Sequence, residues 1–267
     1  MKEHPIIFST SMVRAILGGK RTMTRPVIKP QPEEHVIIPN KIIGLRWKGV
    51  NFGSITRDGR GSIAETSIAT YSPYGQPGDY IYVRETHYRY GWWKRNGISK
   101  TGKQKWTFVS IDREVRYFDN PPDVVRCNSY RAKGWYKRPA IFMPRWASRI
   151  TLEITAVRVE RVQDISEGDA KKEGVEPLYQ EPDEITNQAL RSVGAEEVTQ
   201  PYIIGWTNYQ FKEDRRFRHI PKMSYPEWYS NPRDSFRSLW DSINDKRGCG
   251  WDANPWVWVI EFVQVQR

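Results

Sequence analysis

The chain has 267 residues and is strongly basic, with 42 lysine and arginine residues against 31 aspartate and glutamate residues and a net charge of +11. Its two cysteines and four histidines are too few for a disulfide framework or a zinc site, and no cofactor is expected. No stretch approaches the roughly 18 apolar residues of a membrane span, and the first residues lack the apolar core of a secretory signal. We therefore expect a protein of the reduced cytoplasm.

The first predicted elements are a short buried strand at residues 5–8 and a helix that begins near residues 9–11 and buries Val13, Ile16 and Leu17. Two glycines end the helix. The turn that follows, residues 20–25 (KRTMTR), carries three cations and two hydroxyls. Because guanidinium groups bind phosphates and base edges in a bidentate manner, this turn is a candidate binding site. A solvated helix end whose cations interact with the helix dipole is the alternative.

Residues 30–72 show no sustained period and are interpreted as an insertion with a few irregular strands, whereas the β-branched and aromatic residues at 80–85 predict a strand after a turn. Residues 86–150 then hold fifteen basic and four acidic residues, interleaved with tryptophans. A segregated basic field attracts polyanions, so nucleic acid is the first class of partner to consider and an anionic membrane the second. A basic loop that keeps the protein soluble is the alternative.

The clearest strand is predicted at residues 150–156, where apolar and polar residues alternate. Ser166 opens a short helix that Gly174 ends. Residues 176–231 form a third insertion, acidic at first. A further helix, capped by Asp234 or Ser235, presents one apolar face, and residues 256–265 (WVWVIEFVQV) alternate like a last strand with Trp258 buried.

Four stretches together resemble the ASCH family of the PUA-like superfamily: residues 16–25 (ILGGKRTMTR), 77–85 (PGDYIYVRE), 154–175 and 257–262 (VWVIEF). Residues 143–149 (MPRWASR) and 250–258 (GWDANPWVW) are similar to phage and prophage proteins whose role is poorly defined. The resemblance implies an α+β fold: one PUA-like mixed β-barrel domain over residues 1–267, with short flanking helices. Its core would be residues 5–29, 73–86, 138–175 and 232–267, and its three long insertions residues 30–72, 87–137 and 176–231.

The resemblance also implies candidate catalytic residues. Bacterial acetylcytidine amidohydrolases of this superfamily resemble the chain at the same places, and their Lys, Thr and Glu fall on Arg21, Thr24 and Glu173. Arginine stays charged and cannot activate a nucleophile as lysine can, which leaves the adjacent Lys20 as the other candidate. Glu173 has a plain alternative as a solvated helix residue. Whether the protein is an enzyme is therefore left open.

The residues expected to contact nucleic acid lie on predicted turns, strand ends and loops: Lys20, Arg21, Arg25, Arg84, Glu85, Arg145, Trp146, Trp251 and Asn254. Glu85 is expected to pair with Arg84 or Arg25, and Trp251 and Asn254 to form a stacking and hydrogen-bonding rim. The favoured hypothesis is a protein that binds RNA, single-stranded DNA or a modified nucleobase rather than a membrane. The alternatives are a nucleoside hydrolase or ribonuclease, and a phage protein that binds a host protein.

Overall fold

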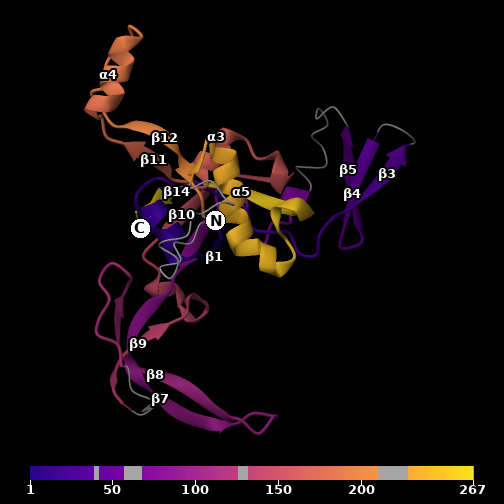
Figure 1. Ribbon diagram of the computed structural model, residues 1–267. Helices are drawn as coiled ribbons and strands as arrows, with labels where there is room; N and C mark the ends of the chain where they lie inside the picture. Colours follow the sequence, from indigo (N-terminus) through magenta and orange to yellow (C-terminus); the bar gives the residue numbers. More distant parts are fainter. Residues whose placement is uncertain (39–41, 57–67, 126–131, 210–227, 267) are drawn as a thin grey trace. The chain divides into compact units, whose positions relative to one another are not determined.

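The computed structural model describes residues 1–38, 42–56, 68–125, 132–209 and 228–266, and it is a mixed α+β protein in which strands predominate (Figure 1). The α+β class is thus confirmed. The chain divides into two compact units, each assembled from separate stretches. Unit 1 comprises Met1–Leu17, Pro73–Ile154 and Val263–Arg267, and unit 2 comprises Gly18–Ser72 and Thr155–Phe262. Over the described ranges, no helix combines the length and apolar character needed to cross a membrane.

Unit 1 begins with a small sheet whose strands were anticipated from their residue pattern. β1 (Glu3–Ile7) runs parallel to β6 (Tyr80–Arg84), and the first residues of β10 (Thr151–Arg161) pair antiparallel with β6. In β6 the side chains of Ile81 and Val83 are buried while their neighbours are partly exposed, as period-2 alternation requires. Helix α1 (Thr10–Leu17) buries Val13 and Ile16, but Leu17 is 42% exposed, contrary to the prediction.

A second sheet of unit 1 consists of three antiparallel strands in the order β8-β7-β9. These are β7 (His87–Ile98), β8 (Gln104–Arg116) and β9 (Gly134–Arg138), and Figure 1 shows β7 and β8 as a long hairpin. Gly91 is required at the centre, because a Cβ atom there would lie 2.2 Å from the carbonyl oxygen of Val109. Regular strands therefore occupy most of the predicted insertion at residues 87–137. We call this three-stranded sheet the basic aromatic sheet.

In unit 2, β14 (Trp256–Val265) pairs antiparallel with β2 (Met23–Thr24), with Ile260 opposite Thr24. The order of the five-stranded sheet is β1-β6-β10-β14-β2, so β1 and β2 are its ends. No closed barrel is found among the strands that the structure describes, and the predicted barrel is not confirmed. The predicted burial of Trp258 is confirmed, at 2% exposure, but Val257 and Val259 are fully buried as well. This part of β14 is covered on both faces rather than one.

Two helices of unit 2 pack against each other and cover its apolar core. α3 (Glu167–Lys172) is capped by Ser166, whose hydroxyl accepts a hydrogen bond from the Asp169 amide, as predicted. α5 (Pro232–Asn244) is capped by Asn231 and not by Asp234 or Ser235. The Asn231 side chain accepts from the Asp234 amide, and proline at the first helical position needs no amide partner. Phe236 and Trp240 of α5 are buried in this core.

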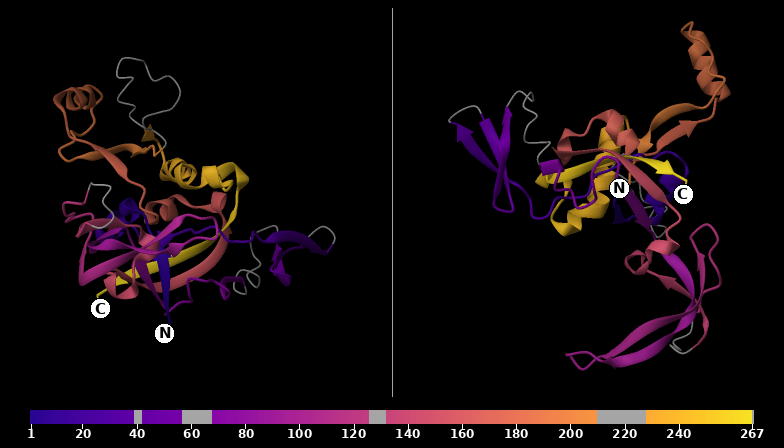
Figure 2. Two further views of the ribbon diagram at one scale, coloured as in Figure 1. Left: turned by 90° about the horizontal axis from the view of Figure 1, so that it is seen from below. Right: turned by 180° about the vertical axis from the view of Figure 1, so that it is seen from behind.

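Two further three-stranded sheets complete unit 2. β3 (Glu33–Ile38), β4 (Ile42–Trp47) and β5 (Val50–Thr56) form an antiparallel meander, more regular than the irregular strands predicted for residues 30–72. β11 (Pro177–Gln180), β12 (Tyr202–Thr207) and β13 (Trp228–Tyr229) form the other. α4 (Glu184–Ser192) lies between β11 and β12 in the chain, and Figure 2 shows it at the end of their two-stranded ribbon.

Candidate functional site

The predicted cationic turn meets Glu173 in unit 2, so the structure brings together three of the four candidate catalytic residues. Arg21 Nη2 lies 2.6 Å from Glu173 Oε2, and it also donates to Thr24 Oγ1 at 3.1 Å. Arg25 Nη1 lies 3.0 Å from Glu173 Oε1. All four side chains are at most 5% exposed. The fourth candidate, Lys20, is exposed and takes no part in the contacts described for this network.

Backbone pairing holds the turn in this position. The Thr22 amide donates to the Lys172 carbonyl at 2.9 Å, which fixes the turn against the end of α3, and the Phe262 amide donates to the Thr22 carbonyl at 2.9 Å. Glu173 directly follows α3, and Arg21 also donates to the Glu173 carbonyl. Residues far apart in the sequence therefore meet because β2 pairs with β14 and the turn before β2 pairs with α3.

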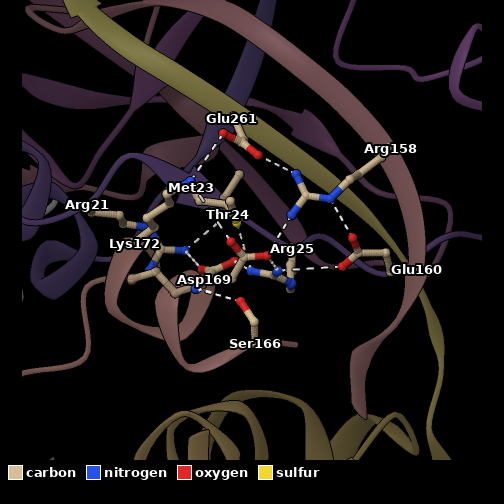
Figure 3. Close-up of polar contacts among 11 residues, drawn as sticks. Arg21, Met23, Thr24, Arg25, Arg158, Glu160, Ser166, Asp169, Lys172 and Glu261 are labelled. Atoms are coloured by element: carbon tan, nitrogen blue, oxygen red, sulfur yellow. Dashed lines mark hydrogen bonds and ion pairs between the residues drawn. The ribbon is translucent and has the colours of Figure 1, made fainter. Parts of the chain in front are cut away.

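The ion network extends from this cluster over β10, α3 and β14 (Figure 3). Asp169 Oδ2 lies 2.8 Å from Arg25 Nη2 and 2.6 Å from Arg158 Nη2, and Arg158 also pairs with Glu160 and Glu261. The charges balance within the network, which contains four cations and four carboxylates: Arg21, Arg25, Arg158 and Lys172 with Glu160, Asp169, Glu173 and Glu261.

The electrostatics of this cluster suit Arg21 and Glu173 to holding each other as an ion pair rather than to exchanging a proton with a substrate. Burial lowers the pKa of Arg21, Glu173 opposes that shift, and the neighbouring Arg25 adds to it. Even so, a guanidinium remains protonated in proteins. Both carboxylate oxygens of Glu173 already accept hydrogen bonds from arginine, and Thr24 Oγ1 accepts one from Arg21. The arrangement joins three elements of unit 2, and a substrate would have to displace an arginine to reach Glu173.

The predicted nucleic-acid contacts Arg84, Glu85, Arg145 and Trp146 belong to unit 1. Glu85 pairs with Arg149 at 2.9 Å, and not with Arg84 or Arg25 as predicted. Burial raises the pKa of Glu85, and the hydrogen bond and charge of Arg149 oppose this. Arg84 donates to the Met143 carbonyl at 3.0 Å. Each of these groups is thus engaged within the unit.

Arg145 and Trp146 lie on a short 3-10 helix of unit 1, Arg145–Ala147. Arg145 pairs with Glu3 at 2.6 Å, and this hydrogen bond is the main reason why its pKa is raised. Trp146 is 48% exposed, and the guanidinium of Arg89 lies 4.7 Å from its ring centroid. Trp146 therefore remains available for contact with a ligand.

Trp251 and Asn254 do not form the exposed rim that the sequence predicted. Trp251 is only 6% exposed, and its ring packs edge-on against Phe236 with centroids 6.3 Å apart. Asn254 adopts a left-handed conformation with φ of 42°, and its Oδ1 accepts from the Gln163 amide at 3.1 Å. Both residues therefore hold the loop before β14 in place rather than offering a surface for a base.

The basic aromatic sheet has a surface whose residues were not among the predicted site residues. On one face, which we call the Trp92 face, Tyr88, Tyr90 and Trp92 alternate along β7, with Trp135 of β9 opposite Tyr90. The rings of Tyr90 and Trp135 lie 5.6 Å apart. The guanidinium of Arg116 lies 4.7 Å from the ring centroid of Trp135.

An open groove of about 360 Å³ lies on this sheet and is lined by Trp92, Trp93, Lys94, Arg95 and Lys133. Its lining contains three cations and no carboxylate, and Lys94, Arg95 and Lys133 are exposed. The Lys133 ammonium lies 5.8 Å from the ring centroid of Trp92. Because consecutive side chains of β7 point to opposite faces, and Trp93 packs edge-on against Phe108 and Tyr136, Trp92 is the ring that accompanies these cations. The period-2 alternation of residues 87–93 (HYRYGWW) is the sequence signal that could have revealed it.

Comparisons with protein-family models, with curated proteins and with solved structures found no match to this chain.

Proposed function

We propose that this protein binds single-stranded nucleic acid, RNA or DNA, through the basic aromatic sheet. The observation that carries the proposal is the groove, in which Trp92 lies beside three exposed cations without a carboxylate. Every base has a π-face that stacks on an aromatic ring, and cations beside the ring attract the phosphates. An unpaired base stacked on Trp92, with phosphates near Lys94 and Lys133, fits this arrangement.

Single-stranded nucleic acid suits the groove better than a duplex. The bases of a duplex are stacked on one another, so their faces are not free to contact a tryptophan, whereas unpaired bases are. The aromatic residues of the Trp92 face recur along one strand and across to the next, which is typical of a stacking platform. The cations on the same sheet add an electrostatic contribution to affinity that does not depend on base sequence.

Fluorescence anisotropy with labelled oligo(U) and oligo(dT), measured over a range of salt concentrations, tests this proposal. Trp92→Ala is expected to weaken binding by about 1–3 kcal/mol, or roughly 5- to 150-fold, and Lys94→Ala to lower the salt slope by about 0.7. Trp228→Ala and Lys246→Ala are matched controls, because Trp228 is 43% exposed and Lys246 is exposed, and both belong to unit 2. Absence of binding at low salt, or equal losses in Trp92→Ala and Trp228→Ala, would contradict the proposal.

We also propose that the core, residues 5–29, 73–86, 138–175 and 232–267, belongs to the ASCH type of the PUA-like superfamily. The proposal is supported by the positions of the four stretches of resemblance, which supply the end of α1, β2, β6, the later part of β10, α3 and most of β14. Within this proposal the finer fold is a mixed β-barrel with short helices at its ends. The basic aromatic sheet would then be an insertion that adds a nucleic-acid surface to the core.

A hydrolase acting on a modified nucleoside is the second candidate, favoured by the close approach of Arg21, Thr24 and Glu173. Incubation with acetylated cytidine and chromatography of the products tests it. Release of cytidine that Thr24→Val abolishes would support hydrolysis at this cluster. Unchanged substrate after prolonged incubation would count against it without affecting the binding proposal.

A further inference from the structure

Three arginines of unit 1 lie around the buried side chain of His87, which is 1% exposed. Arg138 is directly opposite His87 in the β7–β9 ladder, and Arg89 lies two residues further along β7, on the same face of the strand. Arg84 lies at the end of β6. Burial lowers the pKa of His87 most, the charges of Arg89, Arg138 and Arg84 contribute in the same direction, and together they bring it to about 4. We call these three residues the arginine cluster.

The described contacts of the arginine cluster are with neutral groups. Arg89 is 9% exposed and donates to the hydroxyl of Ser110 and to the carbonyl of Asp112 at 2.7 Å, while its Nε is buried without a partner. The Arg84 guanidinium donates to two backbone carbonyls. Arg138 lies over three aromatic rings, with centroids at 4.5–4.9 Å: Trp93, Phe108 and Phe142.

No ion pair within 4.0 Å joins a carboxylate of the described residues to any member of the arginine cluster. The carboxylate of Asp112 attracts Arg89 from farther away, but its Oδ1 accepts from the Glu114 amide. Glu85, whose backbone carbonyl contacts His87 at 3.2 Å, is paired with Arg149. Glu85 is therefore engaged elsewhere, and Asp112 compensates Arg89 only from a distance.

This arrangement leaves most of the positive charge of the arginine cluster uncompensated in a partly buried place. Burial lowers the pKa of both Arg89 and Arg138, and the two arginines repel each other, which lowers the pKa of Arg138 further. Buried charge without a counter-ion is unfavourable, and an arginine with an unpartnered N–H loses a hydrogen bond as well. An anion between these groups would relieve both costs, because guanidinium groups bind oxyanions through parallel N–H···O bonds.

We propose that the arginine cluster with His87 is a binding site for a phosphate group, either free inorganic phosphate or the terminal phosphate of a nucleic-acid strand. A dianion of tetrahedral geometry suits three cations on β6, β7 and β9 whose charges all act on His87, whereas a single carboxylate compensates less of the charge. The site uses the face of β7 that carries His87 and Arg89, opposite to the Trp92 face. It therefore does not rest on the proposed stacking of bases at Trp92.

Isothermal titration calorimetry with inorganic phosphate, against sodium chloride at equal ionic strength, tests the site. We expect a dissociation constant below about 1 mM, and at least a tenfold weakening in Arg138→Gln. Lys100→Gln is the matched control, since it removes one cation from an exposed position of the same unit and should leave phosphate binding unchanged. No heat beyond that of chloride, or equal weakening in the two variants, would overturn the proposal.

A second measurement uses the wild-type protein and does not depend on a variant that folds. The imidazole resonances of His87 report its protonation, and a bound dianion should raise the His87 pKa by at least one unit from about 4. The groups that face His87 are the same with and without phosphate, so they do not cause a difference between the two measurements: Arg84, Arg89, Arg138 and the Glu85 carbonyl. A His87 pKa that is the same with and without phosphate would overturn the proposal.

The two sources of phosphate are separated with oligonucleotides that differ only at the 5′ end. Tighter binding of the 5′-phosphorylated strand, at least tenfold and cancelled by Arg138→Gln, would identify a strand end as the ligand. Equal binding of both strands together with binding of inorganic phosphate would identify the free anion. Trp92→Ala should retain the phosphate response, so failure of the nucleic-acid proposal and failure of the phosphate site give different results.

Discussion

The charge of Glu173 is expected to contribute more to stability than that of any exposed carboxylate in the chain. Glu173→Gln keeps the size of the side chain but removes the partner of two arginines, at 2.6 Å from Arg21 and 3.0 Å from Arg25. The side chains of these three residues are at most 4% exposed, so water cannot replace the lost charge. Breaking one side of such a buried pair costs about 3–5 kcal/mol, because the remaining charge is left uncompensated.

Urea denaturation followed by tryptophan fluorescence measures this loss. The core of unit 2 contains Trp206, Trp240 and Trp251, which makes the emission sensitive to unfolding around the cluster. Glu184→Gln is the control, since Glu184 is 79% exposed in its pair with Arg191 and should contribute less than about 1 kcal/mol.

The double variant Arg21→Met with Glu173→Gln provides a further check. It removes one of the two arginine charges that lose the Glu173 carboxylate as a partner in Glu173→Gln. Its loss in free energy of unfolding should therefore be smaller than the sum of the losses in the two single variants. If Glu173→Gln changes the free energy of unfolding by less than about 1 kcal/mol, or no more than Glu184→Gln does, the interpretation of this cluster as a tightly coupled buried network is wrong.

Three other predictions follow from described features. The pKa of His87 is lowered from 6.5 to about 4 in the folded protein, so the unfolded chain binds more protons between these pH values. The free energy of unfolding should therefore fall by up to about 1.4 kcal/mol per pH unit as the pH drops from 6.5 to 4. Urea denaturation at several pH values measures this dependence, and His87→Gln should lack it. Asn231→Ala should destabilise α5 by about 1 kcal/mol through loss of its cap, measurable by urea denaturation, and an unchanged free energy of unfolding in this variant would contradict the cap at Asn231. Ile260→Ala, at a side chain with 0% exposure, should cost about 2–5 kcal/mol by the same method, and a cost below 1 kcal/mol would show that β14 is not central to the core.

Patterns that act over a few residues predicted the structure best. The alternation at residues 150–156 and 256–265 lies in β10 and β14, and Ser166 caps α3 as expected. These features depend on local backbone preference and on which face of a strand is buried. The meeting of Arg21 and Glu173 was also predicted, but through a resemblance to a family rather than from the residues themselves.

What the sequence did not reveal depends on contacts between distant residues. The burial of Trp251 follows from its packing on Phe236, and the partner of Glu85 is Arg149; no local pattern encodes either pairing. The strands of the basic aromatic sheet were not predicted one by one, because residues 87–137 lie outside the stretches of family resemblance and were interpreted only as a basic aromatic insertion. The cap at Asn231 could have been found, since asparagine before proline is typical of a helix start.

The pairing of β2 with β14 has a consequence for the order of events during synthesis. Thr24 emerges from the ribosome early, but its partner Ile260 follows only after more than two hundred further residues. Until then Arg21 and Arg25 lack the strand that positions them, and both remain hydrated on a nascent chain. Long-range pairing of this kind slows folding, because the entropy of closing a large loop is lost before any contact compensates for that loss. The ion network of unit 2 is therefore expected to be among the last features of the molecule to form.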